Sequence, residues 1–457
     1  MTALNPPKEP LVAIIGSTGT GKSDLAIDLA IKFNGEIINA DAMQMYKGLP
    51  VITNQISPEE QRGIPHHLLA SIDPREPTWT VGLFAREARK LIKEIRSRGK
   101  LPIVVGGTHY YIHSLLFEGS LVRGSGIETD DMNYRPEGEN NSQFPILNEP
   151  TNIILGRLRE VDPVMAERWH PDDRRKIKRS LEIYLTTGKR ASDIYAEQKQ
   201  SKLDSDSVRR PWEALLFWIY TDPEVLKERL DKRVDKMVQR GLMDEVKSLH
   251  SSLHQRTSEG EVVDRSQGIW QSIGHKQMEP FIESEIRGDP IKERERLKEI
   301  GLEDMRAATR QYARYQLRWI RHKSMTALKD HNAMDYLYLL DSTDAREFST
   351  RVLQPAADIC QQFLDGDELI KPTDVSDVAR EVLTSFEKVN ASAPSTYKVK
   401  TCEVCNMSLA TEDQWNQHIG GRKHRRLLRE RKKIALVKVD PECQSYGLSG
   451  VRPDYRE

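Results

Sequence analysis

The chain has 457 residues, of which 38% are hydrophobic and 30% charged, and this is typical of a soluble protein with two or three domains. Its 69 basic and 69 acidic residues cancel, so any binding to nucleic acid must come from local basic patches. No apolar run approaches the roughly 18 residues that a membrane span needs. Four cysteines are too few for a disulfide framework, which favours a reducing compartment.

The first motif is a phosphate-binding loop. Residues 16–23 read GSTGTGKS and match the pattern Gly-x4-Gly-Lys-[Ser/Thr]. A β-branched apolar run at 11–15 precedes the loop and a helical apolar pattern follows it, so backbone N–H groups and the helix dipole point at one anion. Lys22 adds a positive charge, and the Ser23 hydroxyl can ligate Mg²⁺. The loop predicts a phosphate site but does not identify the phosphate compound.

Strands and helices alternate along the chain after this loop. We expect strands at 35–41, 101–105 and 214–220, and a helix at about 82–98. This order predicts an α/β fold with a parallel sheet of the P-loop NTPase type. Ligands of such sheets bind beyond the carboxyl ends of the strands. Asp41 and Thr108 both follow predicted strands, so we expect them near the loop.

Asp41 has three interpretations. It can be a magnesium partner, a general base for an incoming nucleophile, or a cap of the strand end. A lone aspartate is most often a cap. Its place in chain order favours a function, because the first strand after a P-loop helix often presents an acid to the substrate. A base must also lie within hydrogen-bond reach of the proton that it removes.

A long helix is predicted from Asp222 to Gly241, and it places two arginines, Arg229 and Arg233, on one face. Their forked donors can hold an oxygen-rich leaving group. The alternative is a solvated face on which they pair with Asp231 and Asp235. The spacing alone favours this alternative.

Two further predicted helical regions, 152–199 and about 303–323, are rich in basic residues. The first carries Arg157, Arg159, Arg174, Arg175, Lys176, Lys178 and Arg179. The second carries Arg306, Arg310, Arg314, Arg318 and Arg321, with Tyr312, Tyr315 and Trp319. Such helices track phosphodiesters and stack bases, or are simply exposed charged faces. Two of them on a chain without net charge favour nucleic acid.

A metal-binding pattern stands near the C-terminus: Cys402-x2-Cys405-x12-His418-x5-His424. Two thiolates and two imidazoles at these intervals complete a tetrahedral zinc site. A basic run at 422–433 follows the pattern. Cys360 and Cys443 have no partner at ligand spacing and are interpreted as ordinary thiols.

These features predict six regions along the chain. They are 1–122, the first part of the P-loop core; 123–210, a flexible loop and a helical insertion; 211–330, the second part of the core with a basic helix; 331–395, an extension and linker; 396–433, the zinc finger; and 434–457, a tail.

Several motifs, in this order, resemble the tRNA dimethylallyltransferases, also called tRNA isopentenyltransferases, over about 11–323 and the finger. Besides the loop they are NADAMQMYKG at 39–48, PHHL at 65–68, GGTHYY at 106–111, RKIKRSLE at 175–182, RVDKM at 233–237, QSIG at 271–274 and TRQYAR at 309–314. The finger resembles the matrin/U1-like C2H2 type of eukaryotic members, which is associated with RNA. Ala42 stands where serine is commoner and His275 where tyrosine is frequent, and neither change removes a group that the chemistry needs.

The resemblance implies that a dimethylallyl group moves from dimethylallyl diphosphate to N6 of adenosine 37 in the anticodon arm of tRNA. Asp41 then takes the N6 proton, and Thr18 lies near the reacting centre. The implied diphosphate site comprises Gly16, Ser17, Thr18, Gly19, Thr20, Gly21, Lys22, Ser23 and Arg233, with Arg229 as the other candidate. The implied tRNA contacts are Asp41, Ala42, Met43, Gln44, Thr108, Arg175, Lys176, Ile177, Lys178, Arg179, Gln271 and Arg310. The expected cofactors are Mg²⁺ on Ser23 and Zn²⁺ in the finger, and the insertion is expected to bind tRNA.

Two other functional classes stay open at this point. A P-loop kinase of nucleotides or small molecules would share the cradle, the magnesium and the acid, but it would not need the basic insertion or the finger. A non-catalytic RNA-binding protein would not need an intact Lys22, Ser23 and Asp41. The first strand begins by about residue 11, which leaves little room for a cleaved targeting peptide. We therefore expect a cytoplasmic protein without a membrane partner, with nuclear or mitochondrial pools also open. We also expect a monomer.

Overall fold

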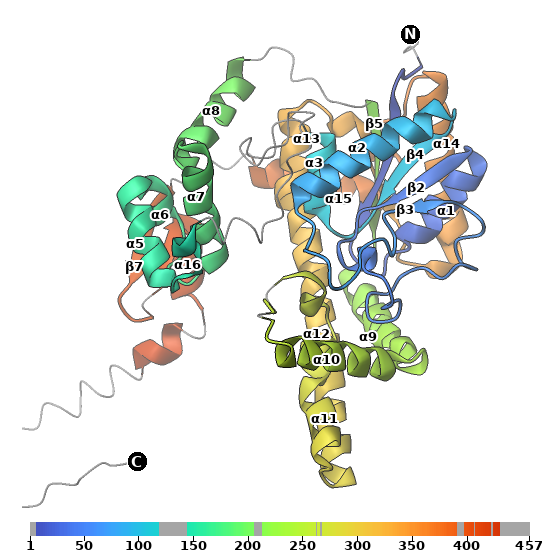
Figure 1. Cartoon of the computed structure of the whole chain (residues 1–457). Helices are drawn as coiled ribbons and strands as arrows, with labels where there is room; N and C mark the ends of the chain where they lie inside the picture. Colours follow the sequence, from blue (N-terminus) through green and yellow to red (C-terminus); the bar gives the residue numbers. More distant parts are fainter. Residues whose placement is uncertain are drawn as a thin grey trace, which may run out of the picture. The chain divides into compact units, whose positions relative to one another are not determined.

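We describe the protein from a computed structural model, over residues 6–117, 144–204, 213–261, 263–265, 267–390, 397–405, 407–421 and 424–429. The chain forms two compact units (Figure 1). One comprises Met1–Gln143 and Tyr195–Ala391, and the other Phe144–Ile194 and Ser392–Glu457. Within the described residues, no helix is long and apolar enough to cross a membrane.

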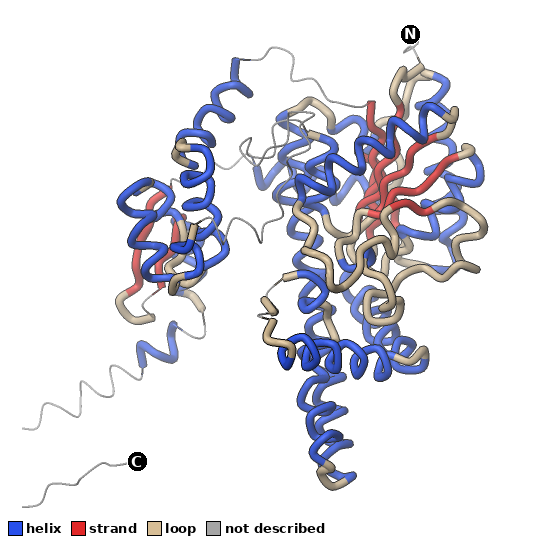
Figure 2. Tube along the Cα trace, viewed as in Figure 1, coloured by secondary structure: helices blue, strands red, loops and turns tan. Residues whose placement is uncertain are grey.

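The first unit is built on a six-stranded parallel sheet with the order β3-β2-β4-β1-β5-β6, drawn red in Figure 2. The strands are β1 (Pro10–Gly16), β2 (Gly35–Asn39), β3 (His66–His67), β4 (Leu101–Val105), β5 (Glu213–Tyr220) and β6 (Leu337–Asp341). The central strands read as continuous apolar runs because helices cover both faces of the sheet. The α/β fold with a parallel sheet is confirmed, whereas β3 and β6 were not predicted.

One face of the sheet packs against α1 (Lys22–Lys32) and α14 (Gln354–Asp365). Leu25 and Leu29 of α1 share this core with Phe363 of α14. The other face packs against α2 (Val81–Ser97) and α3 (His109–Leu116), with Phe84 fully buried. Residues 331–390, expected as an extension, therefore complete the sheet and contribute to both of its cores. This region also contains η5 (Met334–Tyr336), η6 (Ala345–Glu347), η7 (Ser349–Leu353), η8 (Pro372–Asp374) and α15 (Asp377–Asn390).

A group of long helices follows β5. Their bounds are α9 (Pro223–Gln239), α10 (Leu242–Ser258), η3 (Gly268–Gln271), α11 (His275–Arg287), α12 (Ile291–Trp319), η4 (Ile320–Ser324) and α13 (Met325–Asp330). The Asp222 side chain accepts hydrogen bonds from the first two amides of α9, as predicted for this helix start. Helix α12 begins about 12 residues before the predicted 303, because 291–302 is mostly charged and carries little apolar periodicity.

The second unit contains η2 (Pro145–Asn148), α5 (Thr151–Val161), α6 (Pro163–Arg168) and α7 (Arg174–Thr187), while α8 (Ala191–Asp204) spans the boundary between the two units. It also contains the antiparallel hairpin β7 (Tyr397–Cys402) and β8 (Met407–Thr411), followed by α16 (Glu412–Ile419). The expected tail at 434–457 and most of the expected flexible loop at 123–150 lie outside the described residues.

Candidate active site and zinc centre

The phosphate-binding loop connects β1 to α1 in the conformation that its sequence predicts. Gly21 precedes the helix with φ +88°, in the left-handed region that favours glycine, and no side chain caps the described start of α1. The Lys22 Nζ donates to the Ser17 carbonyl at 2.6 Å, and the Thr20 hydroxyl donates to the same carbonyl at 2.9 Å. The uncapped N-terminus and the adjacent ammonium group favour an anion at this place.

The two arginines of α9 have separate partners. Arg233 Nη1 donates to the Thr18 hydroxyl at 2.6 Å, so this guanidinium lies against the loop. Arg229 lies one turn earlier and donates from Nη2 to the Thr343 carbonyl at 2.8 Å. Burial lowers the pKa of Arg233 to about 10, and the Asp41 carboxylate acts in the opposite direction. Of the two candidates, the geometry therefore favours Arg233 as the ligand of an anion in the loop.

Asp41 lies just beyond the end of β2 and is fixed by its own neighbours. The Asn39 side chain accepts from the Asp41 amide at 3.2 Å and donates to its carbonyl at 3.1 Å. The Met43 amide donates to Asp41 Oδ1 at 3.1 Å. Burial raises the pKa of the Asp41 carboxyl, while the charges of Lys22 and Arg233 act to lower it. A positioned carboxyl with a raised pKa has the properties of a general base.

The end of β4 approaches Asp41 so closely that it requires glycine. A Cβ at Gly107 would lie 2.9 Å from Asp41 Oδ2 and 2.5 Å from Gln316 Nε2. The next residue, Thr108, accepts from the Ala42 amide at 3.0 Å through its hydroxyl. The segments at 41–42 and 106–108, expected together at the carboxyl edge of the sheet, are thus in contact.

Helix α12 contributes Gln316, which the sequence did not identify, and Tyr312, which was expected only as a stacking residue of the basic helix. The Gln316 Oε1 accepts from the Thr18 amide at 2.8 Å, and its Nε2 donates to the Gly107 carbonyl at 2.9 Å. This side chain is buried and joins the loop to the end of β4. Tyr312 lies one turn earlier, where burial and then Asp41 raise the pKa of its phenol. The only sequence signal for Gln316 was its closeness to the TRQYAR motif, which contains Tyr312.

The C-terminal part of the first unit also reaches the loop. A Cβ at Gly21 would lie 2.7 Å from a ring carbon of Phe348, so this ring packs directly against the loop. The Thr343 hydroxyl accepts from the Asp222 amide at 3.0 Å, while its carbonyl binds Arg229. Both the phosphate loop and α9 are therefore held by residues after 340.

The other residues of this unit that are expected to contact tRNA differ in their exposure and in their hydrogen-bond partners. Gln44 donates to the Asn54 carbonyl at 2.9 Å, and Met43 is half-buried beside it. Gln271 is exposed at the end of η3. Arg310 binds the carboxylates of Asp231 and Glu303 at 2.6 and 2.8 Å. Their contacts with RNA stay predictions.

In the second unit, the basic segment of α7 presents most of its charges at the surface. Arg175 is exposed, Lys178 is half-buried, Lys176 pairs with Asp173 at 2.7 Å and Arg179 with Glu182 at 2.8 Å. Ile177 is fully buried instead. Its expected contact with RNA is corrected accordingly, because the side chain packs in the core of the unit.

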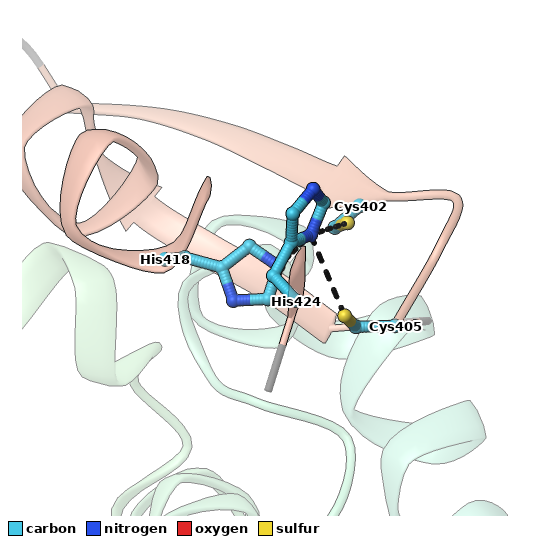
Figure 3. A group of neighbouring side chains, drawn as sticks. All are labelled: Cys402, Cys405, His418 and His424. Atoms are coloured by element: carbon cyan, nitrogen blue, oxygen red, sulfur yellow. Dashed lines mark hydrogen bonds between the residues drawn. The ribbon is translucent and has the colours of Figure 1, made fainter. Parts of the chain in front are cut away.

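The four predicted zinc ligands converge in the second unit (Figure 3). Their ligand atoms all lie within 4.8 Å of one another. His424 Nδ1 lies 3.4 Å from Cys402 Sγ, 3.5 Å from Cys405 Sγ and 3.2 Å from His418 Nε2. Ligand atoms around tetrahedral zinc lie about 3.3–3.8 Å apart, given Zn–N and Zn–S bonds of about 2.0–2.3 Å. The donor set and its spacing therefore fit Zn²⁺.

Comparison with known proteins identifies the family. Residues 44–323 match the IPP transferase family, and residues 400–424 match a zinc finger of C2H2 type. The chain belongs to the IPP transferase family. The tRNA dimethylallyltransferase of Schizosaccharomyces pombe is 39% identical over 439 residues, which cover 93% of this chain and 96% of that protein. The human tRNA dimethylallyltransferase is 33% identical, with 98% and 91% covered.

A solved structure of a eukaryotic dimethylallyltransferase acting on tRNA has the same fold, with a TM-score of 0.74 and 32% identity over 94% of this chain and 99% of that one. The match to the IPP transferase family ends at residue 323. Thr343 and Phe348, which contact α9 and the phosphate loop, lie beyond it.

The pKa of Lys22 generates a first prediction. The pKa of this amine is lowered to about 8, chiefly by burial, while the charge of Asp41 acts to raise the pKa and that of Arg233 to lower it. Below this pH the amine is charged and binds an anion, and above it the charge is lost. We therefore expect the affinity for inorganic diphosphate to fall about tenfold per pH unit above pH about 8.

The control is Lys22→Arg, whose charge persists in this range. Calorimetric titrations at about pH 7 to 9.5 should show the wild-type affinity falling relative to that of the variant, a ratio in which the titration of diphosphate itself cancels. A ratio that stays constant over this range would contradict the assignment of Lys22 to the anion site.

The second prediction concerns the finger. Cys402→Ser removes one of four ligands, so zinc bound to the purified protein should fall from about one ion per chain towards zero. The melting transition of the first unit should stay unchanged, because the finger belongs to the other unit. Metal analysis and thermal melts test this, with Cys360→Ser as the thiol control. Full zinc retention would refute the assigned ligand set.

Proposed function

We propose that this protein is a tRNA dimethylallyltransferase, which moves the dimethylallyl group of dimethylallyl diphosphate to N6 of adenosine 37. The observation that carries the proposal is the convergence of the uncapped phosphate loop, Lys22, Arg233 and Asp41 in one site. The two relatives described above are named tRNA dimethylallyltransferases. A P-loop kinase would share the loop and the acid but would need neither the basic α7 nor the finger.

The loop and its cations stabilise the leaving group. Cleavage of the C–O bond leaves positive charge on the allylic carbon and negative charge on diphosphate. The amides at the start of α1, the Lys22 ammonium and the Arg233 guanidinium all lie at the loop and stabilise that negative charge. A bound dianion also reverses the lowering of the pKa of Lys22, so the arriving substrate keeps this side chain charged.

Asp41 acts on the other substrate. As the N6–C bond forms and the C–O bond breaks, the amine loses a proton to the Asp41 carboxylate. The Oδ2 atom of this carboxylate borders Gly107. Adenosine must leave its stack to reach this acid. Thr18, a residue of the loop, accepts a hydrogen bond from Arg233 through its hydroxyl, and Thr108 orders the 41–44 segment beside the adenosine.

The chain's own residues fit Mg²⁺ at the diphosphate. Ser23 stands in the first turn of α1 with an exposed hydroxyl, a hard oxygen ligand whose site leaves room for water and diphosphate oxygens. The ion would supply charge neutralisation on the leaving group. Arg175, Lys176, Lys178, Arg179, Gln271, Arg310 and the finger are the proposed tRNA contacts. The monomeric state and the cytoplasmic location stay predictions.

The test uses an unmodified tRNA substrate and radiolabelled dimethylallyl diphosphate. The wild type should place label in the RNA, and Asp41→Asn should transfer it at least about 100-fold more slowly, because the base is lost while its shape is kept. Asp365→Asn, an exposed carboxamide change on α14, is the matched control. Transfer at the wild-type rate by Asp41→Asn, or ATP-dependent phosphorylation without label in RNA, would contradict the proposal.

A further inference from the structure

Three aromatic residues gather at the surface where α3 meets α12. The ring of Trp319 lies 5.9 Å from that of Tyr110 and 6.2 Å from that of Tyr315, centroid to centroid. Tyr110 is 43% exposed and Tyr315 is 53% exposed. Among the residues whose exposure is described, these two are the aromatic members of the exposed large hydrophobic set. We call Tyr110, Tyr315 and Trp319 the aromatic surface.

Along α12, the charged residues beside the aromatic surface are all basic. No acidic residue occurs between 305 and 329, where arginines recur along α12. Arg306 and Arg310, at the far end, bind carboxylates of Asp235 and Asp231. Arg314 and Arg318 each precede an aromatic residue of the surface by one position in the sequence and are exposed, and no ion pair with them is found in the part of the chain that the structure describes. Such arginines are available to a polyanion.

The aromatic surface begins within one helical turn of the proposed reaction site. Tyr110 stands two residues after Thr108, whose hydroxyl binds the Ala42 amide. Trp319 stands three residues after Gln316, which binds the Gly107 carbonyl. Both sides of the aromatic surface are thus tied to the glycine that borders Asp41. An adenosine at Asp41 places its neighbouring nucleotides near this surface.

We propose that the aromatic surface stacks a nucleobase next to the extruded adenosine in the anticodon loop, while Arg314 and Arg318 bind the adjoining phosphates. This inference rests on the proposed function. Extrusion of one base removes the stacking partner of the bases on either side. Exposed aromatic rings replace that partner for any base, because every base has a π-face, and each such stack strengthens binding about tenfold. Exposed rings on a helical stretch with arginines and no acidic residue suit RNA better than a protein partner.

The experiment follows 2-aminopurine placed next to the target adenosine in an anticodon stem-loop RNA. Binding to the wild type should quench its fluorescence as it stacks on a ring. Tyr315→Ala and Tyr110→Ala should each remove most of the protein-induced quenching and raise the KM for RNA about tenfold, without changing the affinity for inorganic diphosphate. Tyr315→Phe should keep the wild-type quenching and the wild-type KM for RNA, because the aromatic ring is kept. Arg318→Gln should weaken binding and reduce its salt dependence by about one phosphate contact.

Ile300→Ala is the matched control, since Ile300 is 45% exposed on the same helix. It should leave quenching and KM unchanged. Wild-type quenching and KM in both alanine variants would overturn the inference while label transfer still supports the proposed function. Quenching without label transfer by the wild type would support the aromatic surface and defeat the proposed function. A wild type that binds no RNA would overturn both.

Discussion

The site depends on one buried amide. Gln316 binds the phosphate loop through the Thr18 amide and the end of β4 through the Gly107 carbonyl. The sheet places the loop and the Asp41 segment near each other, but two loops could still take a range of relative positions. Helix α12 reduces this range, since the helix is itself anchored to α9 by the ion pairs of Arg306 and Arg310. The cradle and the acid thereby become a single preorganised site.

Burial disfavours the charged forms of the side chains in this site. Burial lowers the pKa of Lys22 to about 8 and that of Arg233 to about 10, and it raises the pKa of Asp41. The two cations exceed the one anion, and this excess suits the diphosphate of the proposed reaction. Under that proposal, the burial that raises the pKa of Asp41 also favours a strongly charged anion at the phosphate loop.

The sequence predicted what is encoded locally. The phosphate loop, the buried strands and the zinc ligands are each contained in a short run of residues, and the structure places them as expected. It did not predict β6, whose role depends on pairing with β5 across more than a hundred residues. Nor could spacing separate Arg233 from Arg229, because their partners, Thr18 and Thr343, are set by packing. Gln316 and Phe348 were missed for the same reason.

The most direct test of this account is the single-turnover rate of dimethylallyl transfer by Gln316→Met at saturating substrates. The change keeps the length of the side chain and removes both hydrogen bonds. If Gln316 aligns the loop with the acid, the rate falls about 100-fold, as for a misplacement of about 1 Å, while the fold and diphosphate binding persist. A rate within about threefold of the wild type would contradict the account, because the loop and Asp41 would then be aligned without the hydrogen bonds of Gln316.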